Sequence, residues 1–204
     1  SRTYAYDLAG SITQLNGATF ATYDSGNKFS TVPGGSAGYD GIGNLSSISG
    51  TNFTTTSYTW NARSEMRSST QGATTYTYKY NTNYQRSFRT SGSSSGRRWY
   101  VYAGEHLLGE VGPDGATVAY TWGADGLAVE RWVTNNQSLY YHFGPQGEAR
   151  QVTDGSGNIQ LTYVFTAYGV PIASSGSAYN RHRYGGKYGY FTDIQGMILA
   201  WHRW

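Results

Sequence analysis

Aromatic or aliphatic residues alternate with small polar residues along most of the chain, and glycine-rich turns break this alternation at regular intervals. A period of two places every second side chain on the same face of a strand. The chain is also poor in Leu, Ala, Glu and Lys and rich in Tyr, Thr, Trp and Val, which favours strands over helices. The pattern therefore predicts an all-β protein of short strands joined by tight turns.

One unit recurs along the chain: an aromatic residue, one spacer, a second aromatic residue, often Asp or Asn, and then a glycine turn. It first occurs as Tyr4, Tyr6, Asp7 and Gly10. The spacing between successive copies is about twenty residues, which is the signature of a repeat architecture. We assign the second position of the nine copies to Tyr6, Tyr23, Tyr39, Trp60, Tyr80, Tyr102, Trp122, His142 and Phe165.

The residue types of one unit predict a hairpin. Two rings that are two positions apart lie on one side of a strand, while spacers such as Thr77 and Thr121 face the other side. Asp or Asn can bond the backbone of the turn, and a glycine three residues later supplies a positive φ angle. A lone hairpin is marginally stable in water, so consecutive hairpins must pair with one another. We expect an all-β, spiralling sheet of consecutive hairpins, either open or part of a hollow shell; the alternative, an ordinary β-sandwich, does not repeat one unit in every hairpin.

Composition makes tyrosine the main packing residue. Hydrophobic residues are 38% and charged residues 13% of the chain, while 20 Tyr and 28 Gly are present. Tyrosine buries its ring and keeps its hydroxyl hydrogen-bonded. The chain has no cysteine, which excludes disulfides and thiolate metal sites. No apolar run is long enough for a membrane helix, and the opening SRTYAYD is not a signal peptide.

The last third of the chain carries a denser motif. A Tyr-Tyr-His opening leads to a glycine, an arginine, Thr-Asp, Gly-Asn, an aromatic strand and an aromatic-Gly-x-Pro turn. The positions that define it are Tyr140, Tyr141, His142, Gly147, Arg150, Asp154, Gly169 and Pro171, and the pattern continues at Arg183, Gly186, Gly196 and Arg203.

This motif resembles the Rhs-associated core, and the preceding units resemble the YD repeats of the Rhs, teneurin and insecticidal toxin-complex families. The resemblance implies hairpin repeats over residues 1–135 and a core-like segment over 136–204, truncated at its end. It also implies a secreted or cell-surface wall that encapsulates a passenger, usually a toxin, with the core segment forming or adjoining a plug. The departures are Gly144 and Pro145 after the histidine, and Met197 to Leu199 where the family has Leu-Tyr-Tyr.

We expect no catalysis, no metal and no cofactor. In the family, the core continues into an aspartate-dependent self-cleavage region, and such chemistry needs two carboxylates that share a proton. After Asp154 the only acidic residue is Asp193, so we predict no self-cleavage by this chain alone. The four histidines, His106, His142, His182 and His202, are scattered without metal-site spacing.

A basic stretch suggests one further hypothesis. No acidic residue occurs between Glu65 and Glu105, whereas tyrosines alternate there with basic residues. Aromatic and basic side chains together can hold a polyanion such as single-stranded nucleic acid. Basic loops on a wall of net charge +3 explain the same pattern, and we regard nucleic acid as the less favoured reading. The candidate residues are Lys79, Arg86, Arg89, Arg97 and Arg98.

Two functions remain open from the sequence. The chain is either a wall segment that needs the rest of a larger shell or copies of itself, or a self-assembling filament, sheath or adhesive subunit. Unblocked edge strands favour association over a stable monomer in both cases. Tyr- and Trp-lined faces suit stacking on carbohydrate, and Asn44, Asn52 and Asn136 begin glycosylation sequons.

Overall fold

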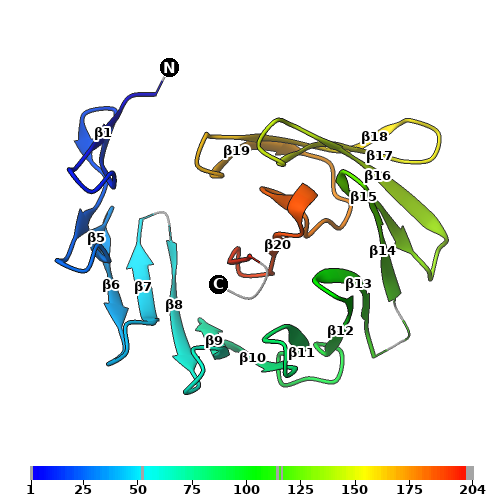
Figure 1. Cartoon of the computed structure of the whole chain (residues 1–204), viewed down its shortest axis with the longest axis horizontal. Coiled ribbons are helices and arrows are strands. Elements are labelled where there is room, and N and C mark those ends of the chain that lie inside the picture. Colours follow the sequence, from blue (N-terminus) through cyan, green and yellow to red (C-terminus); the bar gives the residue numbers. More distant parts are fainter. Residues whose placement is uncertain (1, 52, 114, 116, 201–204) are drawn as a thin grey trace. The chain divides into compact units, whose positions relative to one another are not determined.

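The computed structural model describes residues 2–51, 53–113, 115 and 117–200, and strands dominate them (Figure 1). The single helical element among these residues is a short 3-10 turn, η1 (Gly186–Tyr188). The all-β prediction is confirmed. The strands are β1 (Tyr4–Tyr6), β2 (Ile12–Leu15), β3 (Ala18–Thr19), β4 (Thr22–Tyr23), β5 (Phe29–Val32), β6 (Gly35–Tyr39), β7 (Leu45–Gly50), β8 (Phe53–Trp60), β9 (Met66–Gln71), β10 (Thr74–Tyr80), β11 (Arg86–Thr90), β12 (Arg98–Ala103), β13 (His106–Val111), β14 (Thr117–Gly123), β15 (Gly126–Trp132), β16 (Gln137–Phe143), β17 (Ala149–Thr153), β18 (Ile159–Phe165), β19 (Pro171–Ser175), β20 (Phe191–Thr192) and β21 (Ile198–Leu199).

Each strand pairs with its neighbour in sequence. Strands β4 to β19 form one sheet of 16 strands in chain order, and β1 to β3 and β20–β21 form two smaller sheets. The pairing is antiparallel, as in β14 with β15 and β15 with β16. The sheet does not close on itself, so β4 and β19 are its edges. This order confirms a sheet of consecutive hairpins and is not that of a sandwich.

The hairpin turns use the predicted chemistry. In the first turn, Asp7 Oδ1 accepts hydrogen bonds from the amides of Ala9 and Ser11, at 2.9 and 2.8 Å. The residue three positions after the Asp or Asn has a positive φ angle, as at Gly10 and Gly43, but in three hairpins it is not glycine: Asn27, Ser64 and Tyr84. The same side-chain bonds to the amides two and four residues on are made by Asp24, Asp40, Asn61, Asn81, Asp154 and Asp193.

The two rings of a unit share one face but differ in depth. Tyr120, the first ring of its pair, is buried, Trp122 is half-buried, and the spacer Thr121 between them is exposed. In a later unit the rings of Tyr163 and Phe165 stack with centroids 5.7 Å apart. The facing prediction is therefore correct, but the first ring of the pair lies deeper than the second.

One predicted pair is out of register. Tyr140 and His142 are exposed, whereas Tyr141 is buried and stacks on Phe143 with centroids 5.4 Å apart. The next turn has its positive φ angle at Gly147. In most of the other hairpins the second ring precedes that position by four residues, as Tyr6 precedes Gly10, so the repeat pair here is Tyr141 and Phe143.

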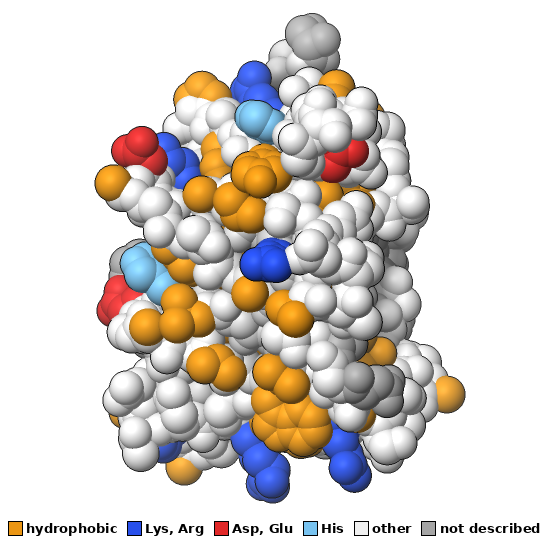
Figure 2. Space-filling view, turned by 90° about the vertical axis from the view of Figure 1, so that its right-hand side faces the viewer, with side chains coloured by type: hydrophobic (Ala, Val, Ile, Leu, Met, Phe, Trp, Pro, Cys, Tyr) orange, Lys and Arg blue, Asp and Glu red, His pale blue; other side chains and the backbone are white. Residues whose placement is uncertain are grey.

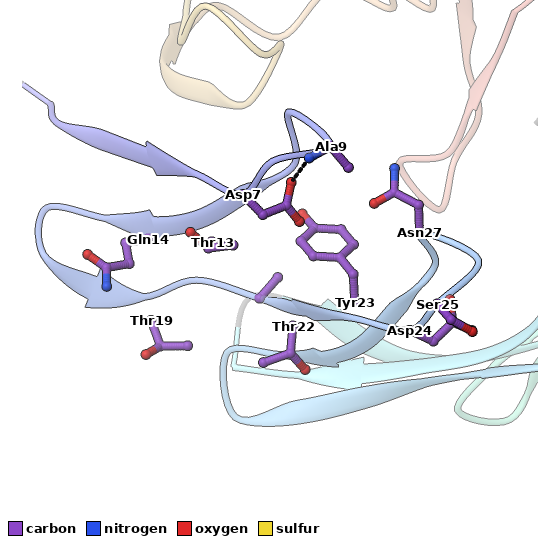
Figure 3. A pocket seen from close by; sticks show the side chains of 11 residues that line it. Asp7, Ala9, Thr13, Gln14, Thr19, Thr22, Tyr23, Asp24, Ser25 and Asn27 are labelled. Atoms are coloured by element: carbon purple, nitrogen blue, oxygen red, sulfur yellow. Dashed lines mark hydrogen bonds between the residues drawn. The ribbon is translucent and has the colours of Figure 1, made fainter.

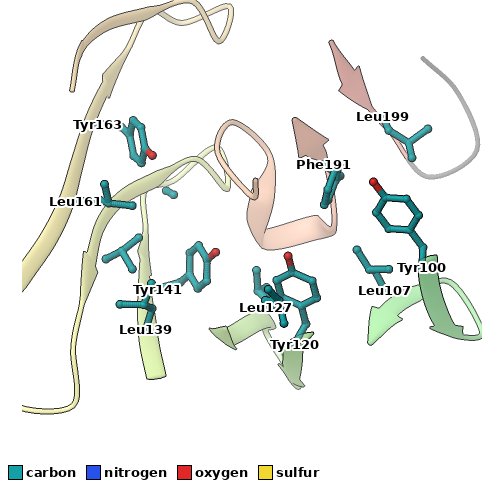
Figure 4. Packing of buried hydrophobic residues seen from close by; sticks show 13 residues of the cluster. Tyr100, Leu107, Tyr120, Leu127, Leu139, Tyr141, Leu161, Tyr163, Phe191 and Leu199 are labelled. Carbon is teal, nitrogen blue, oxygen red and sulfur yellow. The ribbon is translucent and has the colours of Figure 1, made fainter. Parts of the chain in front are cut away.

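The chain forms two compact units, Ser1–Thr77 and Tyr78–Trp204. In the second, one face of β12 to β18 is covered by residues 176–200, which we call the returning segment (Figure 4). We call that face of the sheet the covered face. The expected boundary near residue 135 separates the repeat-like from the core-like part of the sequence. It stays a prediction, because β15 and β16 pair across it. The core of this unit consists of Tyr100, Leu107, Val118, Tyr120, Leu127, Leu139, Tyr141, Ala149, Val152, Leu161, Tyr163, Phe191 and Leu199.

Among the described residues, no helix is long and apolar enough to cross a membrane.

Candidate functional site

The most unusual chemistry of the chain lies under the returning segment, where acids and tyrosines alternate across neighbouring strands. Tyr100 on β12 is opposite Glu110 on β13, and Tyr120 on β14 is opposite Glu130 on β15. All four side chains are buried. The Tyr120 hydroxyl donates to Glu110 at 2.6 Å, and the Tyr141 hydroxyl lies 2.6 Å from Glu130. Buried carboxylates need such partners, because an unpaired one is costly.

The returning segment attaches to this row through polar contacts. The Tyr179 hydroxyl lies 3.3 Å from one oxygen of Glu110. Asn180 Oδ1 lies 3.0 Å from the Tyr141 hydroxyl and also accepts the backbone amide of His182 at 2.8 Å. The tyrosines and acids of the sheet therefore provide a polar seat for residues 179–182.

Burial shifts the acid–base properties of this seat. It raises the pKa of Glu130 to about 7, although hydrogen bonds from Tyr141 and Trp132 act in the opposite direction. It lowers the pKa of His182 to about 3, so the imidazole is neutral at physiological pH. The His182 ring packs edge-on against Tyr120 at 4.6 Å and Phe191 at 5.6 Å. Neither ring nitrogen of His182 has a hydrogen-bond partner in the described structure.

A buried arginine completes the contact at the other end of the segment. The Arg86 guanidinium lies 4.6 Å from the Tyr100 ring centroid and 5.1 Å from that of Phe191. Burial alone lowers its pKa, but the surrounding tyrosines and Asp193 raise it above the ordinary value. Arg86 therefore remains charged and joins the sheet to the returning segment by cation–π contact.

The polyanion hypothesis needs a correction at this point. Arg86 is 1% exposed and Arg89 is 9% exposed, so neither can reach a polymer at the surface. Arg98 is half-buried and lies opposite Arg89 in the ladder. Lys79 and Arg97 are exposed. The alternation of basic and tyrosine residues in the sequence did not show which basic side chains are buried against tyrosine rings.

Asp193 has the role of a turn residue in this structure. Its Oδ1 accepts the amides of Gln195 and Met197, at 2.8 and 3.0 Å, and its Oδ2 lies 3.5 Å from the Tyr78 hydroxyl. Burial raises its pKa, opposed by Arg86 and the turn amides. Whether the chain cleaves itself is not tested by this geometry and stays a prediction.

Several core-motif positions are the points where the returning segment meets the hairpins. At Gly147, a side chain would overlap the ring of Tyr188, and the Lys187 amide donates to the Gly147 carbonyl at 3.1 Å. At Gly169, a side chain would overlap the ring of Tyr184, whose hydroxyl donates to the Ala167 carbonyl at 3.0 Å. These glycines are thus docking positions as well as turn residues.

The other motif residues have local roles. Arg150 pairs with Glu148 at 2.9 Å, and the Arg183 carbonyl accepts the Ala149 amide at 2.9 Å. Gly186 lies in η1 against the side chain of His182, while Pro171 begins β19. Asp154 and Gly196 lie in hairpin turns. Arg203, His202 and Asn52 lie outside the described residues.

Sequence reasoning missed Glu110, Glu130 and Tyr179, whereas Asn180 falls at the Asn of the core's Asn-x-x-Arg-aromatic pattern. One signal was present: the two acids are twenty residues apart, in the same phase of the repeat and within strands rich in apolar residues. A search for acidic residues that recur with the twenty-residue period, in addition to aromatic ones, would have found them. Across the part of the chain that is described, no group of three His, Asp or Glu side chains converges as metal ligands.

A shallow cavity of about 410 Å³ lies in the first unit (Figure 3). The ring of Tyr23 stands in it and donates its hydroxyl to the Ile12 carbonyl at 3.0 Å. Asp7 and Asp24 line the cavity, but Oδ1 of each binds the amides of its own turn. The acids here act as turn residues.

No family model matches the sequence. The chain is 28% identical over 173 residues to the tRNA3(Ser)-specific nuclease WapA of Bacillus spizizenii, a match that covers 81% of this chain and 7% of that protein. The chain thus spans a small part of the curated relative.

Solved structures of Tc toxin assemblies have a similar fold. The chain matches the crystal structure of TcdB2–TccC3–Cdc42 with a TM-score of 0.56 and 17% identity, covering 99% of this chain and 15% of that one. It matches the Photorhabdus luminescens Tc holotoxin pore, with a mutated TccC3, with a TM-score of 0.54 and 14% identity, covering 98% and 15%. At these identities the likeness establishes the shared fold.

Proposed function

We propose that the chain is a structural wall segment of an Rhs or YD-repeat shell that surrounds a passenger domain, typically a toxin. It acts without catalysis and without a cofactor. The observation that carries this proposal is a sheet of consecutive hairpins in which the chain's own returning segment covers one face of β12 to β18. The similarity in fold to chains of Tc toxin assemblies supports it.

The residue chemistry of the seat supports a structural role. Glu110 and Glu130 each bind tyrosine hydroxyls, and the His182 ring is enclosed by aromatic rings. Groups used in this way hold two segments together. We infer that the protein is secreted or at the cell surface, as in the family that its repeats resemble, and that its partners are further wall segments.

The open edge of the sheet supports such partners. All five residues of β19 are exposed, and no charged residue lies in this strand. Natural proteins usually block edge strands with charge, because an open ladder recruits another strand. We infer that further wall pairs with β19.

Sedimentation velocity of the chain at micromolar concentration tests this inference. We expect association that Ile172→Lys in β19 reduces, because a charge blocks edge pairing. Thr121→Lys, on an exposed position of an interior strand, is the matched control and should leave association unchanged. A wild-type chain that stays monomeric at every concentration would contradict the wall proposal.

The passenger is tested on the native protein by limited proteolysis followed by mass spectrometry. A wall that encloses a passenger should protect it until the wall itself is cut. A passenger that is digested before the wall would exclude encapsulation.

The same edge supports a second candidate, a filament or sheath subunit. If β19 accepts the opposite edge strand, β4, of an identical chain, growth has no fixed end. Static light scattering distinguishes the two: a filament grows with concentration, whereas a shell reaches one defined mass.

A further inference from the structure

A basic and aromatic row lies on the uncovered face of β10, β11 and β12, opposite to the returning segment. Phe88 and Trp99 are directly opposite in the ladder, with ring centroids 5.4 Å apart. Lys79 Nζ lies 5.7 Å from the centroid of Phe88. The neighbours of Lys79 and Trp99 in sequence, Tyr78 and Tyr100, are buried, so alternation places Lys79 and Trp99 outside. Trp99 is 41% exposed.

The surroundings of this row are apolar and positively charged. Val101, two residues after Trp99, is 50% exposed, and Leu108 on β13 is 40% exposed. Arg97 is exposed just before β12. Among the described residues, no carboxylate lies within ion-pair distance of Lys79 or Arg97. The sequence has no acid from residue 66 to 104, so these strands and their turns bring only positive charges to the row.

A row of this kind is a distinct feature of the surface. Figure 2 shows one face of the molecule on which hydrophobic side chains lie in several groups, separated by backbone and other side chains, with a few charged side chains among them. A large exposed indole near two cations that have no ion-pair partner in the described part of the chain differs from scattered single hydrophobics, which need no explanation. Tryptophan offers the widest flat apolar surface of any side chain, and its face can lie against the C–H face of a sugar ring.

We propose that Trp99, Phe88, Lys79 and Arg97 form a binding site for an acidic polysaccharide. One sugar ring stacks on Trp99, and its apolar edge lies toward Val101. Carboxylates of neighbouring sugars pair with Lys79 on one side and Arg97 on the other, since charge-assisted hydrogen bonds to carboxylate are the strong ones. This site gives the wall an adhesive role that does not depend on a passenger.

The observations favour a glycan over a nucleic acid. Single-stranded nucleic acid sites present successive aromatic platforms and neutralise many phosphates. Here one ring is well exposed and Phe88 is half-buried. Arg86 and Arg89, which would extend a phosphate track, are buried.

Isothermal titration of the full chain with hexagalacturonate at low ionic strength tests the proposal. We expect binding that weakens with salt, because two charge pairs contribute to it. Trp99→Ala should weaken the affinity roughly tenfold. Lys79→Gln and Arg97→Gln should each weaken binding and flatten its salt dependence. Tyr140→Ala removes a ring that is 40% exposed elsewhere on the sheet and should leave the affinity unchanged.

Four outcomes would overturn the site. Neutral cellohexaose that binds as tightly as hexagalacturonate would remove the acidic ligand from the proposal. Oligothymidylate that binds more tightly would assign the row to nucleic acid instead. Absence of binding, or a Trp99→Ala variant that melts like the wild type and binds equally well, would exclude the row as a site.

Discussion

The two compact units are built from the same repeat and differ in how much they bury. Of the buried hydrophobic side chains among the described residues, four lie in the first unit and fourteen in the second. The turns of both units use the same Asp and Asn bonds, as at Asp7 and Asp154. The repeat therefore produces the ladder, whereas a second layer of chain over the sheet produces the core.

Equivalent rings show the difference directly. Tyr4 and Tyr120 are both first rings of a unit, yet Tyr4 is half-buried and Tyr120 is 4% exposed. Tyr120 lies beneath His182, whereas Tyr4 belongs to the three-stranded sheet β1–β3. The contribution of a repeat residue to the stability of the fold therefore depends on which part of the chain covers its side chain.

The largest expected effect is the loss of a covered ring. Tyr120→Ala should destabilise the second unit by about 3 to 5 kcal/mol, because the ring leaves a cavity and Glu110 loses the shorter of its tyrosine hydrogen bonds. Tyr4→Ala should cost about 1 kcal/mol or less, since its ring is partly in water already. Urea unfolding followed by fluorescence measures both. Equal losses at the two positions would contradict the comparison.

The second prediction concerns pH and belongs to the second unit alone. The pKa of Glu130 in the folded chain is about 7, against an ordinary value of 4.5, so the folded state binds the proton more tightly. This proton stabilises the folded state. The stabilisation is fully present below the ordinary pKa of 4.5 and is lost as the pH rises toward 7. Its size is about 3 kcal/mol, from 1.4 kcal/mol per pKa unit.

The variant Glu130→Gln isolates this contribution. Its unfolding free energy should lack the decline that the wild type shows between pH 4.5 and about pH 7. His182, with its pKa of about 3, has the opposite effect: it reduces the stability of the folded chain as the pH falls below 6.5, the ordinary pKa of histidine. Because His182 is present in both proteins, its effect cancels in the comparison. Parallel pH profiles for the two proteins would disprove the assignment.

Hydrogen exchange gives a third test of the comparison. Amides of β13 to β16 should exchange at least roughly tenfold more slowly than those of β2 to β5, because covered ladders open less often. Phe191→Ala, which removes a ring of the returning segment, should reduce the gap. Similar protection in the two units would show that the ladder alone sets local stability.

The smallest expected effect is a gain in the first unit. Ser64 has a φ angle of 57°, where glycine is more comfortable than serine. Ser64→Gly should stabilise by about 0.5 kcal/mol, because relief of strain exceeds the added entropy of the unfolded chain. Ser87→Gly, at a strand position, should instead destabilise. A lower melting temperature for Ser64→Gly would refute the strain argument.

Local features of the fold could be predicted from the sequence. The rings and turn residues of a unit lie within one hairpin, so the local sequence is enough to assign their roles, as for Tyr6, Asp7 and Gly10. The assignment of Tyr140 and His142 as a repeat pair was wrong, because two adjacent tyrosines do not show which of them faces the core. Counting back four residues from Gly147 resolves it in favour of Phe143.

The seat of the returning segment could not be predicted in the same way. Tyr179 reaches Glu110, and Phe191 reaches Tyr100, across long stretches of chain. No local pattern encodes such contacts. The burial of Arg86 depends on these same contacts, which is why the basic stretch looked more accessible in sequence than it is.

The order of the returning segment along the chain has a kinetic consequence. Residues 176–200 follow all the strands that they cover, so a chain emerging from its amino end presents β12 to β18 before their cover exists. Contacts of such high contact order form late and slowly. Until then the rings of Tyr100 and Tyr120 are open to water and to other chains. The appearance of residues 176–200 therefore sets the time at which this unit can finish folding, and the exposed rings are prone to aggregation during that interval.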